Sequence, residues 1–330
     1  MVFYNVYGVK IDSDLDAFPR IFRREEKFKS VDLIVKKKDF DVKNTCKKFS
    51  VKFRYENGKY VTFNSGFKFY NFKLMVKNLT QKTTEVYYNK CGYVENKLYN
   101  LKHIISRIFL YKLLKNGLLL LHCGGVEIDK KGVLIFAPSD TGKTSTVLSL
   151  AKKLNAKIIG DDVCLCDLKS VYRYTDMLSI YPKSEFFPPS LRKKIICKYA
   201  FKRTISFIPY LSLKIHPNLK LPADCFGESS ERARIKKVYL LEKDKNLELC
   251  SIPEEEALNK ILSVNHGLLA LRGNFPPVFW RSLCYAFKIN PFELEMGYAK
   301  SIEKLLKKAE VFLVKGKDYH AFSEKISETV

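Results

Sequence analysis

Residues 137–144 read Ala-Pro-Ser-Asp-Thr-Gly-Lys-Thr, a spacing typical of a phosphate-binding loop of the form G-x-x-x-x-G-K-[ST], with Ala137 at the first glycine. Small residues let successive backbone N–H groups face a polyphosphate, Lys143 supplies a positive charge, and the Thr144 hydroxyl can bind Mg²⁺. Alanine suits the first position if its φ is negative. A glycine-containing turn without a ligand is the alternative. The predicted nucleotide-binding residues are Pro138, Ser139, Asp140, Thr141, Gly142, Lys143, Thr144 and Ser145.

A pair of carboxylates follows, in the sequence Gly160-Asp161-Asp162. The two acids come 18 and 19 residues after Lys143, a distance that suits one helix and a returning strand. The acids would then lie beside the loop, at the carboxyl edge of the sheet, where ligands bind in α/β proteins. One of them could hold Mg²⁺ and the other could take a proton from an incoming hydroxyl. An acidic turn that binds nothing is the competing interpretation.

His122 is the third candidate, since it lies at the end of an apolar run 21 residues before Lys143. A single histidine among leucines is commonly a core residue. At the same edge of the sheet, however, it could orient an Asp or contact a phosphate.

The flanking segments predict the elements that hold these residues. An apolar strand over 133–136 precedes the loop, a helix over 145–154 follows it, and a buried strand covers 157–159. This β-loop-α-β unit predicts a mostly parallel sheet. A broad apolar stripe predicts a helix over 101–116, ended by Gly117.

The first hundred residues alternate apolar and polar side chains and are rich in Val, Tyr and Phe, which predicts a small antiparallel sheet with a hairpin turn at residues 56–59. We therefore expect an α/β protein with a β-rich N-terminal domain over 1–100 and a second domain over 101–330. Within the latter, residues from about 170 to 235 are expected to form an irregular, partly mobile insertion, and the sequence does not reveal the order of 182–232. A strand over 238–243, a helix over 253–264 and a last strand over 311–314 follow.

Composition narrows the function classes. The chain has 330 residues, of which 46% are hydrophobic and 28% charged, so it is neither collagenous nor largely disordered. Its net charge of +24 favours acidic partners without choosing among them. We find no run of about 18 apolar residues, no signal-peptide pattern and no paired cysteine spacing, so we expect no membrane span and a cytoplasmic location with reduced thiols. Cys164 and Cys166 are expected in the core on one strand face, and a metal or redox role for them is the minority interpretation.

Taken together, the segment HCGGVEIDKKGVLIFAPSDTGKTSTVLSLAKKLNAKIIGDDV resembles the HPr kinase/phosphorylase superfamily, and more closely its HPr-kinase-like serine kinases. The resemblance is specific over residues 122–163 and weaker on both sides. It implies a P-loop fold of the phosphoenolpyruvate-carboxykinase-like kind.

The resemblance also implies roles for single residues. Lys143 and the loop backbone would bind the phosphates of ATP, and Thr144 and Asp162 would bind Mg²⁺. Asp161 would be the base, and His122 would support the Asp. The family's Glu-x-Arg-Gly-Leu-Gly signature is absent between 163 and 235, so we carry over neither HPr as acceptor nor phosphorolysis nor a hexamer. The nearest candidates for a further metal ligand and a phosphate-binding arginine are Glu231, Arg232 and Arg234.

The leading hypothesis is an ATP- and Mg²⁺-dependent kinase that phosphorylates a hydroxyl, with serine as the first choice, on a peptide, protein or small molecule. The alternative is a catalytically silent nucleotide-binding regulatory module. A nucleic-acid-binding NTPase is motivated only by the charge, and no nucleic acid is expected as a partner. A homo-oligomer is left open. The basic residues of 192–203 either face an acidic substrate or form a solvated helix face.

Overall fold

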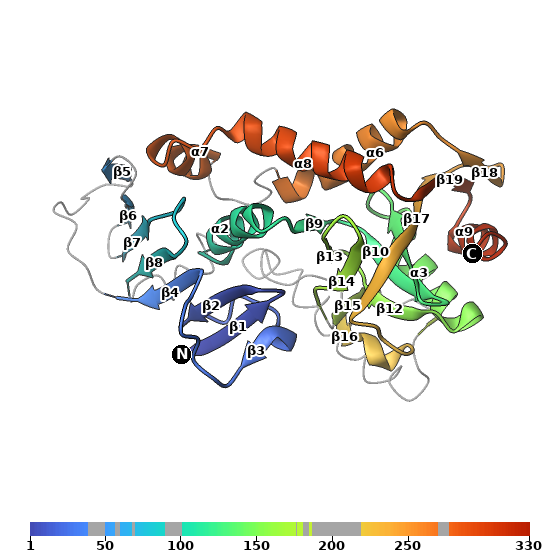
Figure 1. Cartoon of the computed structure of the whole chain (residues 1–330), viewed down its shortest axis with the longest axis horizontal. Coiled ribbons are helices and arrows are strands. Elements are labelled where there is room, and N and C mark those ends of the chain that lie inside the picture. Colours follow the sequence, from blue (N-terminus) through green and yellow to red (C-terminus); the bar gives the residue numbers. More distant parts are fainter. Residues whose placement is uncertain are drawn as a thin grey trace. The chain divides into compact units, whose positions relative to one another are not determined.

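A computed structural model of the chain describes residues 1–38, 50–56, 60–67, 70–89, 101–175, 177–180, 185–186, 219–269 and 277–330. They belong to two compact units, one of residues 1–118 with 269–298 and one of residues 119–268 with 299–330. Each unit has a mixed β-sheet and helices, which places the chain in the α/β class (Figure 1). The domain boundary at residue 100 stays a prediction. The helix that begins at Leu101 has most of its contacts within the first unit.

The first unit contains an eight-stranded sheet in the order β3-β1-β2-β4-β8-β7-β6-β5. Its strands are β1 (Val2–Val6), β2 (Val9–Ser13), β3 (Arg23–Arg24), β4 (Leu33–Lys37), β5 (Ser50–Glu56), β6 (Tyr60–Phe67), β7 (Tyr70–Lys77) and β8 (Thr84–Tyr88). The predicted hairpin has its two strands, which pair Glu56 with Tyr60, while residues 57–59 of the turn lie outside the described residues. The expectation of a purely antiparallel sheet was wrong, because β4 pairs in parallel with both β2 and β8.

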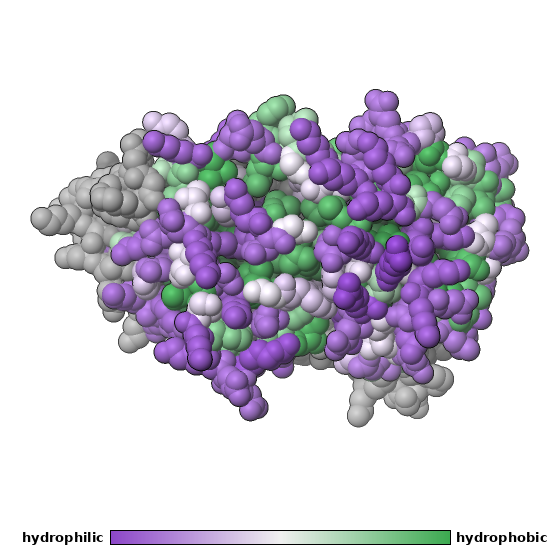
Figure 2. All heavy atoms as spheres, viewed as in Figure 1, coloured by the Kyte–Doolittle hydropathy of each residue, from purple (hydrophilic) through white to green (hydrophobic). Residues whose placement is uncertain are grey.

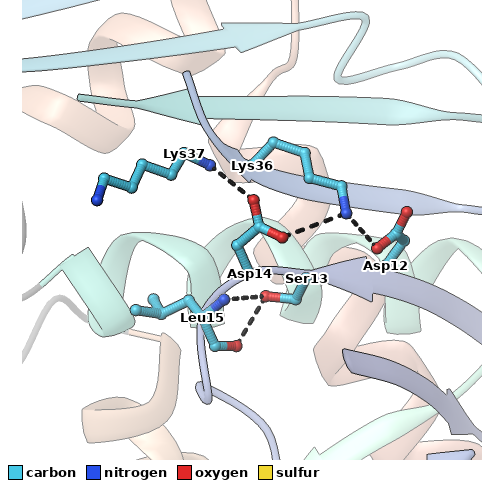
Figure 3. Close-up of polar contacts among 6 residues, drawn as sticks. All are labelled: Asp12, Ser13, Asp14, Leu15, Lys36 and Lys37. Carbon is cyan, nitrogen blue, oxygen red and sulfur yellow. Dashed lines mark hydrogen bonds and ion pairs between the residues drawn. The ribbon is translucent and has the colours of Figure 1, made fainter. Parts of the chain in front are cut away.

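An ion-pair cluster supports the parallel pairing of β2 and β4. Lys36 on β4 donates to Asp12 at 2.5 Å and to Asp14 at 3.4 Å, as Figure 3 shows. The backbone N–H of Lys37 donates to the second carboxylate oxygen of Asp14, at 3.2 Å. Two strands that run in the same direction need a long connection, so this pairing depends on contacts distant in sequence.

The predicted helix over 101–116 is α2 (Leu101–Lys115), and Gly117 follows it with a φ of +73°. It packs against the segment that follows β2, where the rings of Phe109 and Phe18 lie 5.2 Å apart. Lys112 is buried and donates to the carbonyls of Gln81 and Lys82, and burial lowers its pKa to about 8. The helix α7 (Pro277–Ala286) and the first half of α8 (Pro291–Leu306) complete this unit.

The second unit contains a nine-stranded sheet in the order β12-β10-β11-β17-β14-β13-β9, with β19 paired to both β17 and β18. Its strands are β9 (Leu119–Leu121), β10 (Gly124–Ile128), β11 (Lys131–Phe136), β12 (Lys157–Gly160), β13 (Cys164–Cys166), β14 (Ser170–Arg173), β17 (Arg232–Lys243), β18 (Glu248–Ser251) and β19 (Glu310–Gly316). A separate pair joins β15 (Met177–Ile180) to β16 (Leu219–Pro222). The expected mobile insertion lies mostly outside the described residues.

The expectation of a mostly parallel sheet was wrong, since among the described strands of this sheet parallel pairing is limited to β11 with β17 and β17 with β19. The antiparallel strand β10 lies between β11 and β12. The reason is a two-residue hairpin in which Asp129 and Lys130 have φ values of +49° and +63°. Two positive φ angles are the signature of a type I′ turn, which reverses the chain at once. Because the turn lacks the usual Asn-Gly pair, this hairpin was not predicted.

Helices α3 (Lys143–Leu154) and α9 (Tyr319–Ser327) pack together over one face of this sheet. The core between them contains Val147, Leu150 and Phe322, all fully buried. Ser149 on α3 donates to Ser323 on α9 at 2.8 Å. On the face drawn in Figure 2, hydrophilic side chains cover most of the described surface, in keeping with the charged composition.

Close packing of α3 on the sheet depends on Gly124, at the start of β10. A Cβ atom at this position would lie 2.6 Å from the Cγ2 atom of Val147, a distance that real Cβ contacts essentially never show. Val147 is β-branched and fully buried, so it cannot rotate away without disturbing the core. A side chain at residue 124 would therefore displace the helix that follows the predicted phosphate loop.

We predict that Gly124→Ala lowers the stability of the second unit by about 1–3 kcal/mol, the usual effect of overpacking a core. The measurement is the urea unfolding midpoint. Gly297→Ala, on α8, is the matched control, since nothing lies within 4 Å of its added Cβ and alanine favours a helix. A Gly124→Ala midpoint equal to that of the wild type would contradict the packing argument.

Candidate functional site

Three chain segments meet at one edge of the second sheet. Strand β10 is antiparallel to both of its neighbours, so its first residue lies at the edge where β11 and β12 end. The register pairs Gly124 with Ile135 and Gly125 with Gly160. The loop after β11, the acids after β12 and His122 before β10 therefore emerge together, as the sequence predicted for the loop and the acids.

The loop between β11 and α3 has alternating backbone conformations. Asp140 and Gly142 have φ values of +62° and +111°, while Ala137 and Thr141 are not among the residues with positive φ. Ala137 thus meets the condition of a negative φ under which alanine suits the first position of the loop. Alternation of right- and left-handed conformations turns successive N–H groups toward one concave side, which is an anion-binding nest. The start of α3 adds the positive end of its helix dipole.

Lys143 opens α3 and is held by two partners. Its side chain is only 7% exposed, and its Nζ atom lies 3.0 Å from Nε2 of His122 and 3.9 Å from Oδ1 of Asp162. A lysine ammonium has only donors, so Nε2 of His122 is the acceptor in this contact. This contact with Lys143 differs from the role of supporting the Asp that the family resemblance implies for His122.

Asp161 and Thr144 form the second contact of the site. The Thr144 hydroxyl lies within hydrogen-bond distance of both carboxylate oxygens of Asp161, at 2.9 and 3.0 Å. Asp161 is 1% exposed. Its burial, with the nearby charge of Asp162, raises its pKa to about 7 against the opposing effects of Lys143 and Thr144. The side chain of Asp162 is 46% exposed and can reach a ligand in solvent.

Asn265 holds the histidine segment in place. It is fully buried on α6 (Glu254–Leu269), and its side-chain oxygen accepts the backbone N–H of His122 at 2.7 Å. Its amide nitrogen donates to the carbonyl of Ile261 at 2.9 Å. Asn265 was not among the predicted site residues, since it lies one position beyond the helix predicted over 253–264, whereas α6 continues to Leu269.

Tyr319, also missed, lies against the phosphate loop. A Cβ atom on Gly142 would be 3.5 Å from the Cβ atom of Tyr319. The Tyr319 hydroxyl donates to Glu185, its ring lies 5.4 Å from that of Phe186, and desolvation raises its pKa to about 12. No local pattern around residue 319 pointed to residue 142, which lies far away in the sequence.

The site does not include the arginines that the sequence offered as phosphate ligands. Arg232 and Arg234 begin β17, where Arg234 pairs with Lys131 at the opening of β11. The phosphate loop follows the other end of β11, at Phe136, about 16 Å away for a strand of this length. That suggestion was therefore wrong. The basic run at 192–203 lies outside the described residues.

The remaining predicted residues surround the loop. Pro138, Ser139 and Asp140 are exposed, while Thr141 is buried and Ser145 half-buried. Within the described part of the chain, no three His, Cys, Asp or Glu side chains gather as a metal site, and no helix is long and apolar enough to cross a membrane. Thr144, Asp161 and Asp162 are hard oxygen donors, which fit Mg²⁺, an ion usually held by one or two carboxylates together with substrate phosphates.

The two cysteines of β13 belong to the core and not to the site. Cys164 and Cys166 are both fully buried, as expected. Burial raises the pKa of the Cys166 thiol well above its usual range, which disfavours a reactive thiolate.

No protein-family model and no curated protein matches the chain. Among solved structures, the chain is similar to the HPr(Ser) kinase/phosphatase from Coxiella burnetii, at 14% identity. The match covers 46% of this chain and 97% of that one, with a TM-score of 0.25. A likeness this weak does not establish a shared fold, so the chemistry of the site has to be argued from its own geometry.

We predict that Asp161 makes stability fall as the pH rises. Its folded-state pKa of about 7 exceeds the ordinary 3.8, so between these values the folded chain keeps a proton that the unfolded chain releases. The free energy of unfolding therefore decreases from about pH 4 to about pH 7. Asp161→Asn removes this effect and should gain on the order of a few kcal/mol over the wild type at pH 8, but less at pH 5.

The measurement is urea unfolding at both pH values, without nucleotide or Mg²⁺. Asp129→Asn, in the exposed β10–β11 turn, is the matched control and should follow the wild type. If the gain of Asp161→Asn is the same at pH 5 and pH 8, the buried carboxylate is ionised throughout and the argument fails.

Proposed function

We propose that the second unit is an ATP- and Mg²⁺-dependent phosphotransferase that acts on a hydroxyl group, with serine as the leading acceptor. One observation carries this proposal. Beside the loop that forms an anion-binding nest, Thr144 contacts the carboxylate of Asp161 and Lys143 lies within 4 Å of the carboxylate of Asp162. Such a set is what transfer of a γ-phosphoryl group requires. The acceptor is a peptide, a protein or a small molecule.

In this proposal, the loop and Lys143 bind the phosphate tail. The backbone N–H groups of residues 139, 140 and 142–145 and the dipole of α3 face the anion, while the N–H of Thr141 donates to the carbonyl of Pro138. Lys143 is already directed by His122 and Asp162, so little side-chain entropy is lost when it turns to a phosphate oxygen.

Asp161 acts as the general base. A carboxylate with a pKa near 7 can accept the proton of a hydroxyl and release it again, which is the condition for efficient general-base catalysis near neutral pH. Thr144 and Asp162 would hold Mg²⁺ together with the nucleotide, and the ion would neutralise charge that develops on the phosphoryl oxygens. The more open position of Asp162 suits this role, because a hydrated ion needs access from solvent.

We predict that Lys143→Ala weakens ATP binding by about 10- to 100-fold, because a hydrogen bond to a charged group contributes about 1.5–3 kcal/mol. Asp161→Asn should keep ATP binding and lose about 10²- to 10⁴-fold in transfer, the usual contribution of a general base. The assay mixes the protein with ATP, Mg²⁺ and either free serine or cell extract and follows the phosphorylated acceptor.

Lys152→Ala, at an exposed position of α3, is the control for the first variant, and Asp129→Asn is the control for the second. Transfer at the wild-type rate by Asp161→Asn would exclude Asp161 as the base. ATP binding by the wild type without transfer to any acceptor would instead favour a catalytically silent nucleotide-binding module.

A further inference from the structure

A pocket of about 360 Å³ adjoins the start of the phosphate loop. Its floor is formed by the carboxyl ends of β11, β17 and β19, with Phe136, Leu240 and Leu313 nearly buried. Its other wall is one face of α6, where Asn259, Lys260, Ser263 and Val264 follow at helical spacing. The volume lies at the lower end of the range for small-molecule sites.

This pocket and the phosphate loop share a wall. Ala137 and Pro138 line the pocket and are also the first residues of the loop. The pocket therefore begins at the same residues at which the predicted phosphate loop begins. The predicted phosphate tail enters a nest made by the next residues of the same segment.

The position of the reactive groups gives the ligand a direction. In the sheet order β12-β10-β11-β17, the acids and His122 belong to the β10–β12 side of the loop, while the pocket lies on the β17 side. The terminal phosphoryl group has to lie with the acids and Lys143. The opposite end of the nucleotide then points to the pocket, and the acceptor hydroxyl approaches from the acid side.

The chemistry of the pocket suits a nucleoside. Its floor is apolar, and the charges of Lys260 and Glu242 compensate each other in an ion pair of 2.8 Å. A neutral, flat base buries its faces well against such a surface, whereas a phosphate would lack a net positive partner there. The Asn259 amide offers both a donor and an acceptor, which matches the edge of a purine.

We propose that this pocket, between α6 and the ends of β11, β17 and β19, binds the nucleoside of the phosphate donor. The assignment rests on the proposed function. It names Asn259 and Ser263 as the residues that select a nucleotide over inorganic polyphosphate. It also gives α6 two functions, since the neighbouring residue Asn265 positions His122.

The test compares ATP with inorganic tripolyphosphate, both with Mg²⁺, by calorimetry on the full chain. The wild type should bind ATP at least about tenfold more tightly, which equals about 1.4 kcal/mol. Ser263→Phe fills the pocket from an exposed helix position and should reduce the ATP affinity to that of tripolyphosphate, with tripolyphosphate binding unchanged. Glu324→Phe, exposed on α9, is the control for an added aromatic ring and should keep the preference for ATP.

The outcomes separate this inference from the proposed function. If the wild type binds neither ligand, the proposed function fails and the pocket assignment fails with it. If Ser263→Phe still prefers ATP as the wild type does, only the pocket assignment is wrong. Loss of phosphoryl transfer by Ser263→Phe with ATP binding intact would show that the pocket holds the acceptor. If the phenylalanine disturbs folding, Asn259→Ala is tested in its place. This variant adds no volume and should weaken the binding of ATP while leaving the binding of tripolyphosphate unchanged.

Discussion

The direction of strand β10 is the constraint on which the site depends. Because β10 runs against both β11 and β12, the end of the β9–β10 connection meets the ends of its two neighbours at one edge. A parallel strand in its place would put His122 at the opposite edge of the sheet. The tight turn at Asp129 and Lys130 enforces the reversal, and Gly124 lets α3 approach closely enough for Lys143 to reach His122.

The electrostatics of the site follow from the close approach of its charged side chains. Three ionisable side chains, Lys143, Asp161 and Asp162, lie at one place, and two of them are nearly removed from water. Burial and the second acid favour the neutral form of Asp161, while Lys143 and Thr144 oppose this, and the balance leaves the pKa near 7. Lys143 and Asp161 have therefore lost most of their contact with water before a ligand arrives, while Asp162 keeps its own.

The local sequence predicted what short-range rules control. The loop, the helix after it and the strand that leads to the acids were predicted closely, since spacing and apolar period decide them. The same rules failed for strand pairing. The antiparallel β10, the parallel β4 and the far position of Arg234 result from contacts between residues distant in sequence. Asn265 and Tyr319 escaped notice for the same reason, because each acts on a residue more than a hundred positions away.

In the proposed binding mode, helix α6 serves both ends of an elongated ligand. Asn265 fixes the backbone at His122, on the side of the acids, and the face with Asn259 and Ser263 lines the pocket on the other side. Both tasks need the helix at the carboxyl edge of the sheet. Its first turn is acidic, with Glu254, Glu255 and Glu256, which stabilises its N-terminus but places negative charge on that part of the surface. In the proposed binding mode, the favourable potential for a polyphosphate therefore comes from the loop, Lys143 and the start of α3, and the apolar pocket adds binding that does not depend on charge.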